Sequence, residues 1–285
     1  MSEPTPAALP FSVLMSYYAG DRPDHLEEAF LSVTAHQDLP PAEVVLVRDG
    51  PVGRELAERV TRLQAESAVP VRHVELATNQ GLAGALTAGL AEVHHAIVAR
   101  MDADDVSLPS RFAVQVPLIA EGLDLVGSAI TEFGEEAAAE RTRPVVRGAD
   151  GIANQARLRS PFNHPSVVFR ISAVQSAGGY VDLGMMEDYW LWVRMIAAGA
   201  KVDNVDEVLV RYRVSDGAYG RRGGWTLLRS ELSLQRAMRR AGFTTRREYA
   251  RNVLVRGAYR MIPESFRRAL YRLAFVRRSG RPRRN

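Results

Sequence analysis

The sequence predicts an α/β fold in which a mostly parallel sheet is flanked by helices. Between residues 11 and 101, short apolar runs alternate with segments whose apolar residues recur at helical spacing. This order predicts strands joined by helical crossovers, and right-handed crossovers place helices on both faces of the sheet. Polar residues follow each apolar run, as they do where parallel strands end at a ligand-binding edge.

The predicted elements begin with a strand over residues 11–18 and a helix over residues 24–36. The alternation continues with strands at 44–47, 71–76 and 96–101 and with helices at 56–63 and 82–93. The pattern then loosens into a strand over 123–130, an acidic excursion over 135–140, an exposed return over 141–147 and a strand over 166–170. A helix opens near residue 186, and Trp190 and Trp192 face opposite sides of it, so one is expected in the core and the other at a surface.

Length and composition are those of an ordinary globular protein. A chain of 285 residues with 46% hydrophobic and 25% charged residues forms one large α/β domain with an appendage, or two modest domains. No apolar run is long enough to span a bilayer, and the first residues lack the layout of a signal peptide. Because there is no cysteine, disulfides and thiolate zinc sites are excluded, and a reducing cytoplasm is the expected location.

The C-terminal segment is strongly basic. Residues 267–284 hold eight arginines, and no acidic residue follows Glu264. Phe266, Leu270 and Leu273 recur at helical spacing among these arginines, which predicts an amphipathic helix that contacts an anionic membrane surface. The alternative is a solvated basic face. Nucleic acid is not an expected partner, because the few aromatic residues of the tail do not form a stacking platform.

Three carboxylates, Asp102, Asp104 and Asp105, follow the strand predicted at 96–101. Carboxylates this close repel one another, and a divalent cation makes such a cluster favourable. The alternative is an acidic turn that precedes a helix beginning near Pro109 and Ser110.

The ends of the other predicted strands carry polar residues that converge on the same edge. They are Ser16 and Tyr17, Asp49, and the segment from Asn79 to Gly81. Any one of these residues alone has the composition of a turn. Neither a dinucleotide-binding glycine motif nor a P-loop is present, so phosphate bound at this edge requires another source of positive charge, such as a metal ion.

Several motifs in order resemble the family 2 glycosyltransferases, which share the GT-A fold. The motifs are Ser16-Tyr17, Arg48-Asp49-Gly50, Asn79-Gln80-Gly81-Leu82, residues 100–105 with Leu108-Pro109-Ser110-Arg111-Phe112, Asn163-His164-Pro165, Glu187-Asp188 and Arg211-Tyr212-Arg213. The resemblance covers roughly residues 10–225, and residues 219–224 are similar to the subgroup of amylovoran-type exopolysaccharide transferases.

The resemblance implies a nucleoside-diphosphate sugar, with a pyrimidine nucleotide such as UDP, as the donor. Asp49 then accepts hydrogen bonds from the base, Ser16 and Tyr17 flank the base, and Asn79 and Gly81 belong to the same binding site. Asp102 lies near the ribose, and Asp104, with Asp102, binds the Mn²⁺ or Mg²⁺ ion that bridges the diphosphate. Arg100 steadies the acidic cluster or the phosphates.

The resemblance also implies that Asp188 is the general base of an inverting transfer and that Glu187 holds the start of its helix. The helix N-terminus is expected to keep Asp188 ionised at neutral pH. Trp190 and Ser215 stand where many relatives have an acid and a histidine of the metal site, so His164 is a candidate substitute for phosphate or metal contact. Arg213, Arg221 and Arg222 are candidates for clamping the diphosphate.

The predicted organisation is a tail (1–10), a GT-A domain (11–225) and a basic helical extension (226–285). Within the domain, residues 11–121 bind the nucleotide sugar, and residues 122–225 provide the acceptor and catalytic half. The expected activity is metal-dependent, inverting transfer of a sugar to a glycan or lipid-linked acceptor in cell-surface polysaccharide or glycolipid synthesis, at the inner face of the membrane. The alternative is a non-catalytic nucleotide-sugar-binding module. A sugar nucleotidyltransferase is disfavoured, because no glycine-rich loop follows Tyr18.

Overall fold

The computed structural model describes residues 9–134, 140–214 and 225–261. The chain divides into two compact units. The first comprises residues 1–182 and 187–214, and the second comprises residues 183–186 and 215–285. The predicted amphipathic helix around residues 266–273, together with Arg221 and Arg222, lies outside the described residues.

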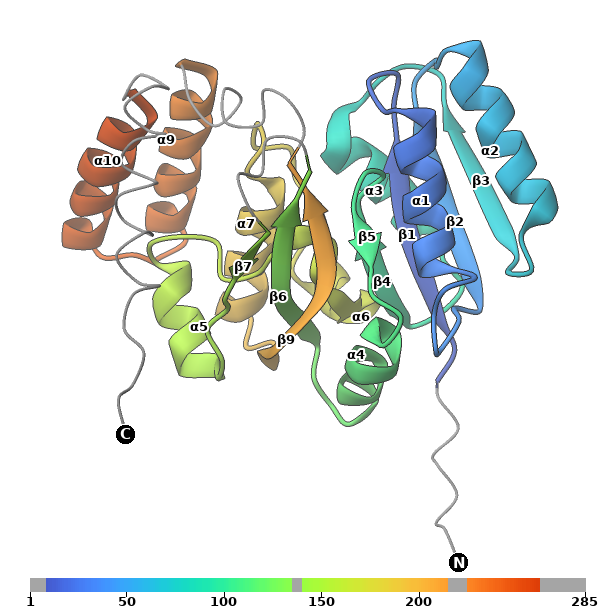
Figure 1. Cartoon of the computed structure of the whole chain (residues 1–285). Helices are drawn as coiled ribbons and strands as arrows, with labels where there is room; N and C mark the ends of the chain where they lie inside the picture. The colour runs from blue at the N-terminus through green and yellow to red at the C-terminus, as the bar shows by residue number, and fades with distance from the viewer. Residues whose placement is uncertain (1–8, 135–139, 215–224, 262–285) are drawn as a thin grey trace, which may run out of the picture. The chain divides into compact units, whose positions relative to one another are not determined.

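The first half of the main sheet is parallel, as the sequence predicts. The strands are β1 (Phe11–Tyr17), β2 (Glu43–Asp49), β3 (Val71–Leu76) and β4 (Ile97–Met101). They lie in the order β3-β2-β1-β4, and each neighbouring pair is parallel. The crossovers between them are α1 (Pro23–Val33), α2 (Arg54–Glu66) and α3 (Gly81–Glu92) (Figure 1).

The second half of the sheet mixes directions. Its elements are β5 (Val106–Ser107), α4 (Arg111–Ala120), β6 (Leu125–Phe133), β7 (Arg141–Arg143), α5 (Ala149–Ala156), a short 3-10 helix η1 (His164–Ser166), β8 (Val168–Arg170), α6 (Ile171–Ser176), α7 (Glu187–Ala197) and β9 (Val202–Arg213). The order continues from β4 as β8-β6-β9-β5, with β7 paired to β6. β8 is antiparallel to both β4 and β6, whereas β9 runs parallel to β6, beside which it lies in Figure 1.

The core has two layers, one on each face of the sheet. Successive side chains of a strand point to opposite faces, and accordingly Val13 and Met15 belong to one buried cluster and Leu14 to the other. Buried residues of α1, α2 and α4 complete the first cluster, and residues of α3, α5 and α7 complete the second. In α7, Trp192 is fully buried and Trp190 is partly exposed, which confirms the prediction for that pair.

The second unit contains α9 (Trp225–Arg240) and α10 (Arg246–Met261), which pack against each other. Their interface contains a polar seam: Arg256 donates to both carboxylate oxygens of the fully buried Glu231, at 2.6 and 2.8 Å. Gln235 donates to Glu231, and Asn252 donates to Gln235. No helix in the described parts of the chain is both long and apolar enough to cross a membrane.

A tight turn after β2 depends on glycine. Gly50 has φ +83°, and an added Cβ would lie 2.6 Å from the backbone nitrogen of Asn79. The turn therefore brings the end of β2 against the segment that precedes α3. A side chain at residue 50 is disfavoured both by backbone strain and by this contact.

We expect Gly50→Ala to lower the free energy of unfolding by about 2–3 kcal/mol, of which roughly 1 kcal/mol is backbone strain. Gly199→Ala is the matched control, because Gly199 has φ +82° but a Cβ added there would have no atom within 4 Å. Urea unfolding of both variants separates the strain from the contact with Asn79. Equal losses of stability would contradict the steric argument.

Candidate functional site

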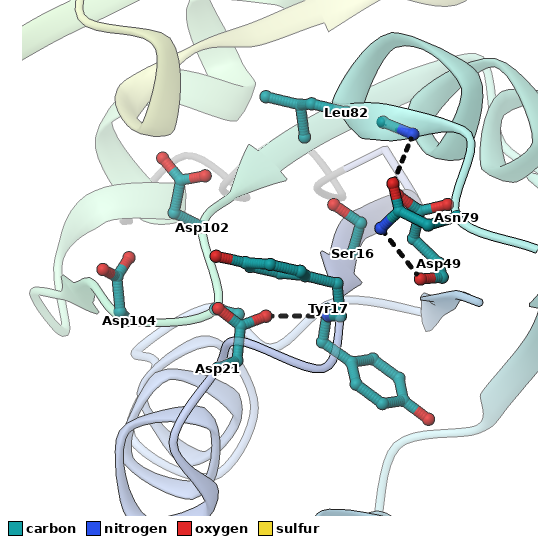
Figure 2. Close-up of a pocket in the computed structure, with 11 residues that line it drawn as sticks. Ser16, Tyr17, Asp21, Asp49, Asn79, Leu82, Asp102 and Asp104 are labelled. Carbon is teal, nitrogen blue, oxygen red and sulfur yellow. Dashed lines mark hydrogen bonds between the residues drawn. The ribbon is translucent and has the colours of Figure 1, made fainter. Parts of the chain in front are cut away.

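A pocket of about 330 Å³ lies at the carboxyl ends of β1, β2 and β4. Seven residues predicted from the sequence line it: Ser16, Tyr17, Asp49, Asn79, Gly81, Asp102 and Asp104. The structure adds Tyr18, Asp21, Leu82 and Ala103 to the lining. In Figure 2, Asp49 and Asn79 lie on one side of the pocket, and the carboxylates of Asp21, Asp102 and Asp104 lie on the other. The pocket therefore has one wall formed by Asp49 and Asn79, and an acidic wall formed by Asp21, Asp102 and Asp104.

Hydrogen bonds between the end of β2 and the start of α3 fix the wall formed by Asp49 and Asn79. The Asp49 carboxylate accepts a hydrogen bond from the backbone N–H of Gln80 at 2.6 Å. The side-chain amide of Asn79 donates to the Asp49 carbonyl at 3.2 Å, and its oxygen accepts from the Gly81 N–H at 3.2 Å (Figure 2). These contacts fix the buried Asp49 at the edge of the pocket.

Two adjacent tyrosines have different environments. Tyr17 is buried, and its hydroxyl forms a 2.8 Å hydrogen bond with Nε2 of His73 on β3. Tyr18 is 49% exposed, and its ring lies against Gly20. The predicted strand extends to Tyr18, but β1 ends at Tyr17. The resemblance names Tyr17 beside the base, whereas Tyr18 is the more exposed of the two tyrosines that line the pocket.

The acidic wall concentrates negative charge in a partly buried space. Burial, together with the Asp102 charge, raises the pKa of Asp104 to about 6. Burial also raises the pKa of Asp21 to about 7, with smaller contributions from Asp104 and Asp102. The Asp21 carboxylate accepts a 2.8 Å hydrogen bond from the Tyr18 N–H. An acidic residue shortly after the first strand is the signal that could have identified Asp21.

Carboxylates that repel one another can be brought together by a hard divalent cation, which prefers oxygen ligands. Asp102 and Asp104 supply such oxygens in the lining of the pocket. Within the described residues, no group of three His, Asp or Glu side chains is arranged to hold a metal ion. A cation at Asp102 and Asp104 therefore requires further oxygen ligands from a bound molecule or from water.

The loop that carries Asp102, Asp104 and Asp105 is hydrogen-bonded to the end of β9. Asp105 is fully buried and accepts a 2.7 Å hydrogen bond from the Arg213 N–H. The Arg213 side chain donates to the Asp104 carbonyl at 2.7 Å and forms an ion pair with Glu28. Arg213 thus supports the loop, and its predicted role as a clamp on a diphosphate stays a prediction.

Two buried arginines lie beneath the acidic wall. Arg100 is fully buried and forms an ion pair with Asp102, while its Nε and Nη1 have no hydrogen-bond partner among the described residues. Burial acts to lower the pKa of Arg100, but the charge of Asp102 and its hydrogen bond outweigh burial, so the pKa is raised. Arg111 donates to the Arg100 carbonyl at 2.7 Å, and burial lowers its pKa to about 9. Neither arginine lines the pocket.

A second cluster surrounds the start of α7. Burial, followed by the charge of Glu187, raises the pKa of Asp188 to about 7. The expectation that the helix N-terminus keeps Asp188 ionised at neutral pH omits burial, which outweighs the hydrogen bond at the helix start and raises the pKa. Glu187 is itself buried, and burial raises its pKa.

His164 lies in the same cluster. It forms a 3.1 Å hydrogen bond with the Tyr180 hydroxyl, and its ring meets Trp192 edge-on with centroids 6.0 Å apart. Burial, followed by the charge of Arg100, lowers the pKa of His164 well below its usual value. His164 is therefore neutral at pH 7, and it does not line the pocket that contains Asp102 and Asp104.

Comparisons with solved structures agree with this architecture. The Staphylococcus aureus TarS 1–349 structure in complex with UDP-GlcNAc matches with a TM-score of 0.66 at 16% identity, over 94% of this chain and 76% of that one. The Pyrobaculum calidifontis mannosyltransferase in complex with GDP-Man and Mn²⁺ matches with a TM-score of 0.61 at 18% identity, over 98% of this chain and 80% of that one. Both neighbours have the GT-A fold, which confirms the predicted fold class.

Comparisons of sequence show the family. The family model described as glycosyl transferase family 2 matches residues 12–173. The amylovoran biosynthesis glycosyltransferase AmsE of Erwinia amylovora is 38% identical over 92% of this chain and 97% of the relative. An Escherichia coli protein described as UDP-Gal:alpha-D-GlcNAc-diphosphoundecaprenol beta-1,3-galactosyltransferase is 33% identical over 95% of this chain and 98% of the relative. The chain therefore belongs to glycosyl transferase family 2 and is a glycosyltransferase.

Proposed function

We propose that this glycosyltransferase uses a UDP-sugar, requires a divalent cation and inverts the configuration of the transferred sugar. The observation that carries the proposal is the pocket whose opposite walls hold Asp49 and the carboxylates Asp102 and Asp104. A nucleoside diphosphate matches both walls: its base lies beside Asp49, and its phosphates lie beside Asp102 and Asp104. The E. coli relative, named for a UDP-Gal donor and a diphosphoundecaprenol-linked acceptor, supports a UDP-sugar donor and a lipid-linked or glycan acceptor.

The base of the nucleotide lies between Asp49 and Tyr18 in this proposal. Asp49 is fixed at the pocket edge, where a carboxylate accepts a hydrogen bond from a pyrimidine N–H. Tyr18 presents a half-exposed aromatic face to the same pocket, whereas the hydroxyl of Tyr17 is already bonded to His73. In this proposal, stacking on Tyr18 replaces the base-flanking role that the resemblance implies for Tyr17.

Asp104 and Asp102 hold a divalent cation in this proposal. A bound Mn²⁺ or Mg²⁺ supplies positive charge that stabilises the departing nucleoside diphosphate. The protein's own contribution is to fix both carboxylates on a short loop that Asp105 and Arg213 hold in place. The Asp21 carboxyl lies in the same wall, and a cation bound there favours its ionised form.

Asp188 serves as the general base. It removes the proton from an acceptor hydroxyl as that oxygen attacks the anomeric carbon opposite the leaving diphosphate. A base with a pKa of about 7 is well matched to this task near neutral pH. Glu187 adjoins it at the start of α7. The alternative, a module that binds the donor without turnover, does not require a base with this tuned pKa.

The remaining predicted residues have supporting roles. Arg100 balances the carboxylates, Arg213 supports the acidic loop, and Arg221 and Arg222 clamp the diphosphate. His164 positions Tyr180 as a neutral hydrogen-bond partner. The enzyme works at the cytoplasmic face of a membrane that presents its lipid-linked acceptor, and the basic C-terminal region contacts that surface.

Tyr18→Ala should weaken UDP binding by about 10-fold or more, because base stacking on an aromatic ring contributes about 1–3 kcal/mol. Tyr18→Phe should keep the wild-type affinity. Tyr17→Phe should leave UDP affinity unchanged, since it removes only the hydroxyl that contacts His73. Isothermal titration calorimetry measures all three, and a Tyr18→Ala protein with wild-type affinity would exclude the stacking role.

Chelation of divalent ions should weaken UDP binding, because the carboxylates of the acidic wall then repel the diphosphate. Titrations with Mn²⁺ and with EDTA measure this metal-dependent gain in affinity. Asp104→Ala should abolish the gain, while Asp38→Ala, at an exposed position outside the pocket, should retain it. An equal gain in Asp104→Ala and wild type would place the metal elsewhere.

Asp188→Asn should lower kcat by about 10² to 10⁴, the usual contribution of a general base, while UDP affinity stays unchanged. In the wild type, kcat should rise with pH through about 7, because Asp188 must lose its proton to act. The variant should lack this rise. Asp150→Asn is the matched control, since Asp150 lies in the first turn of another helix, α5.

The assay incubates the enzyme with a panel of nucleoside-diphosphate sugars and a diphosphate-lipid acceptor, and it measures release of the nucleoside diphosphate. Wild-type kcat for Asp188→Asn would refute its role as base. Donor binding without release from any donor by the wild type would favour the non-catalytic alternative.

A further inference from the structure

The turn that follows β1 is closed by two hydrogen bonds between the same two residues. The Asp21 N–H donates to the Tyr18 carbonyl at 3.1 Å, which is the hydrogen bond of a β-turn. The Asp21 carboxylate accepts the Tyr18 N–H at 2.8 Å (Figure 2). A Cβ added at Gly20 would lie 2.5 Å from the ring of Tyr18, so this ring lies across the turn. The turn therefore fixes Tyr18 and Asp21 relative to each other in the pocket that both line.

The Asp21 carboxylate has one oxygen that contacts the chain and one that does not. Oδ2 accepts the Tyr18 N–H, whereas Oδ1 has no hydrogen-bond partner among the described residues. Asp21 also forms no ion pair with a residue that the structure describes. An ionised carboxylate only accepts hydrogen bonds, and its two oxygens offer about four sites for donors. Asp21 is therefore oriented by the turn and can still accept a hydrogen bond from a molecule in the pocket.

Asp21 is not arranged to share one cation with Asp102 and Asp104. The three carboxyls lie on the acidic wall, and the charges of Asp104 and Asp102 act on Asp21. Within the described residues, however, no group of three His, Asp or Glu side chains is arranged to hold a metal ion. A phosphate is excluded as well, because an ionised carboxylate has no proton to donate to a phosphate oxygen. The partner of Asp21 is therefore a hydrogen-bond donor of the bound molecule.

The position of Asp21 identifies which part of a nucleotide it contacts. Its turn carries Tyr18, on which the base stacks in the proposed function, and its carboxyl lies on the wall with Asp102 and Asp104, beside the phosphates. In a nucleoside diphosphate, the group between the base and the phosphates is the ribose. The 2′- and 3′-hydroxyls of the ribose are hydrogen-bond donors, which is the chemistry that Asp21 requires.

We propose that Asp21 accepts a hydrogen bond from a ribose hydroxyl of the donor and makes the pocket selective for ribonucleotides over deoxyribonucleotides. The inference rests on the proposed function, since it requires a nucleoside diphosphate in the pocket. The resemblance places only Asp102 near the ribose, at the end of β4, whereas Asp21 approaches from the turn after β1. A site that hydrogen-bonds a hydroxyl rejects the analogue that lacks it, because the polar group of the protein is then left without its partner.

The test compares the affinities of UDP, 2′-deoxy-UDP and 3′-deoxy-UDP for the full chain, by isothermal titration calorimetry in Mn²⁺. At least one deoxy analogue should bind the wild type about 10-fold more weakly than UDP does, because a hydrogen bond to a charged group is lost. For that analogue, Asp21→Ala should lose the discrimination. Asp21→Asn should retain part of it, since the amide oxygen of asparagine still accepts a hydrogen bond from a hydroxyl. Each comparison is a ratio of affinities within one variant, so a change in the folded fraction does not alter it.

Two control variants separate the ribose contact from the other contacts of the nucleotide. Asp24→Ala should discriminate as the wild type does, because Asp24 is exposed in the first turn of α1 and does not line the pocket. Tyr18→Ala keeps the backbone N–H that Asp21 accepts, so it should weaken the binding of UDP and of both deoxy analogues by the same factor.

Unchanged discrimination in Asp21→Ala would overturn the inference, as would equal affinities of all three nucleotides for the wild type. Loss of the Mn²⁺-dependent gain in UDP affinity in Asp21→Ala, with discrimination intact, would instead identify Asp21 as a metal contact. In each of these outcomes UDP still binds the wild type, so the proposed function stands. A wild-type protein that does not bind UDP in Mn²⁺ would overturn both.

Discussion

The ion pair between the buried guanidinium of Arg100 and Asp102 is the interaction on which the electrostatics of the site depend. A buried charge is tolerated only when it is paired, and Arg100 is paired with Asp102 at the edge of the pocket. Its charge also acts on Asp188, Asp105 and His164. At Asp188 and Asp105 it opposes burial, which raises the pKa of both carboxyls. Arg111 donates to the backbone carbonyl of Arg100 and so supports the end of the strand that precedes Asp102.

The parallel half of the fold is predictable because its signals are local. Apolar runs and helical periodicity lie within single segments, and the four strand ends converge once the sheet is parallel. β9 is not predicted as a strand, and only its last three residues belong to a motif of the resemblance. Asp203, Asp206 and Glu207 interrupt its alternation, and its pairing with β6 shifts register near Ala129. Such a strand is identified only by its partners, which lie about 80 residues away in the chain.

The residue types of the site are predictable, but their environments are not. The motif leads to Asp188, yet its pKa depends on burial and on Glu187 and Arg100, which a helix-start argument does not include. His164 is a reasonable candidate for an anion contact, but its burial beside Trp192 makes it neutral. Tyr18 and Asp21 escape prediction because each requires knowing where β1 ends and how the following loop returns to the sheet.

The hydrogen bond from Arg213 to Asp105 joins residues that are 108 positions apart. During synthesis, the strands that frame the pocket emerge long before β9. The acidic loop, however, has no support from β9 until residue 213 has left the ribosome. The pocket is therefore completed only after nearly all of the first unit has been made, so a nascent chain that has folded its parallel half still lacks a fixed acidic wall.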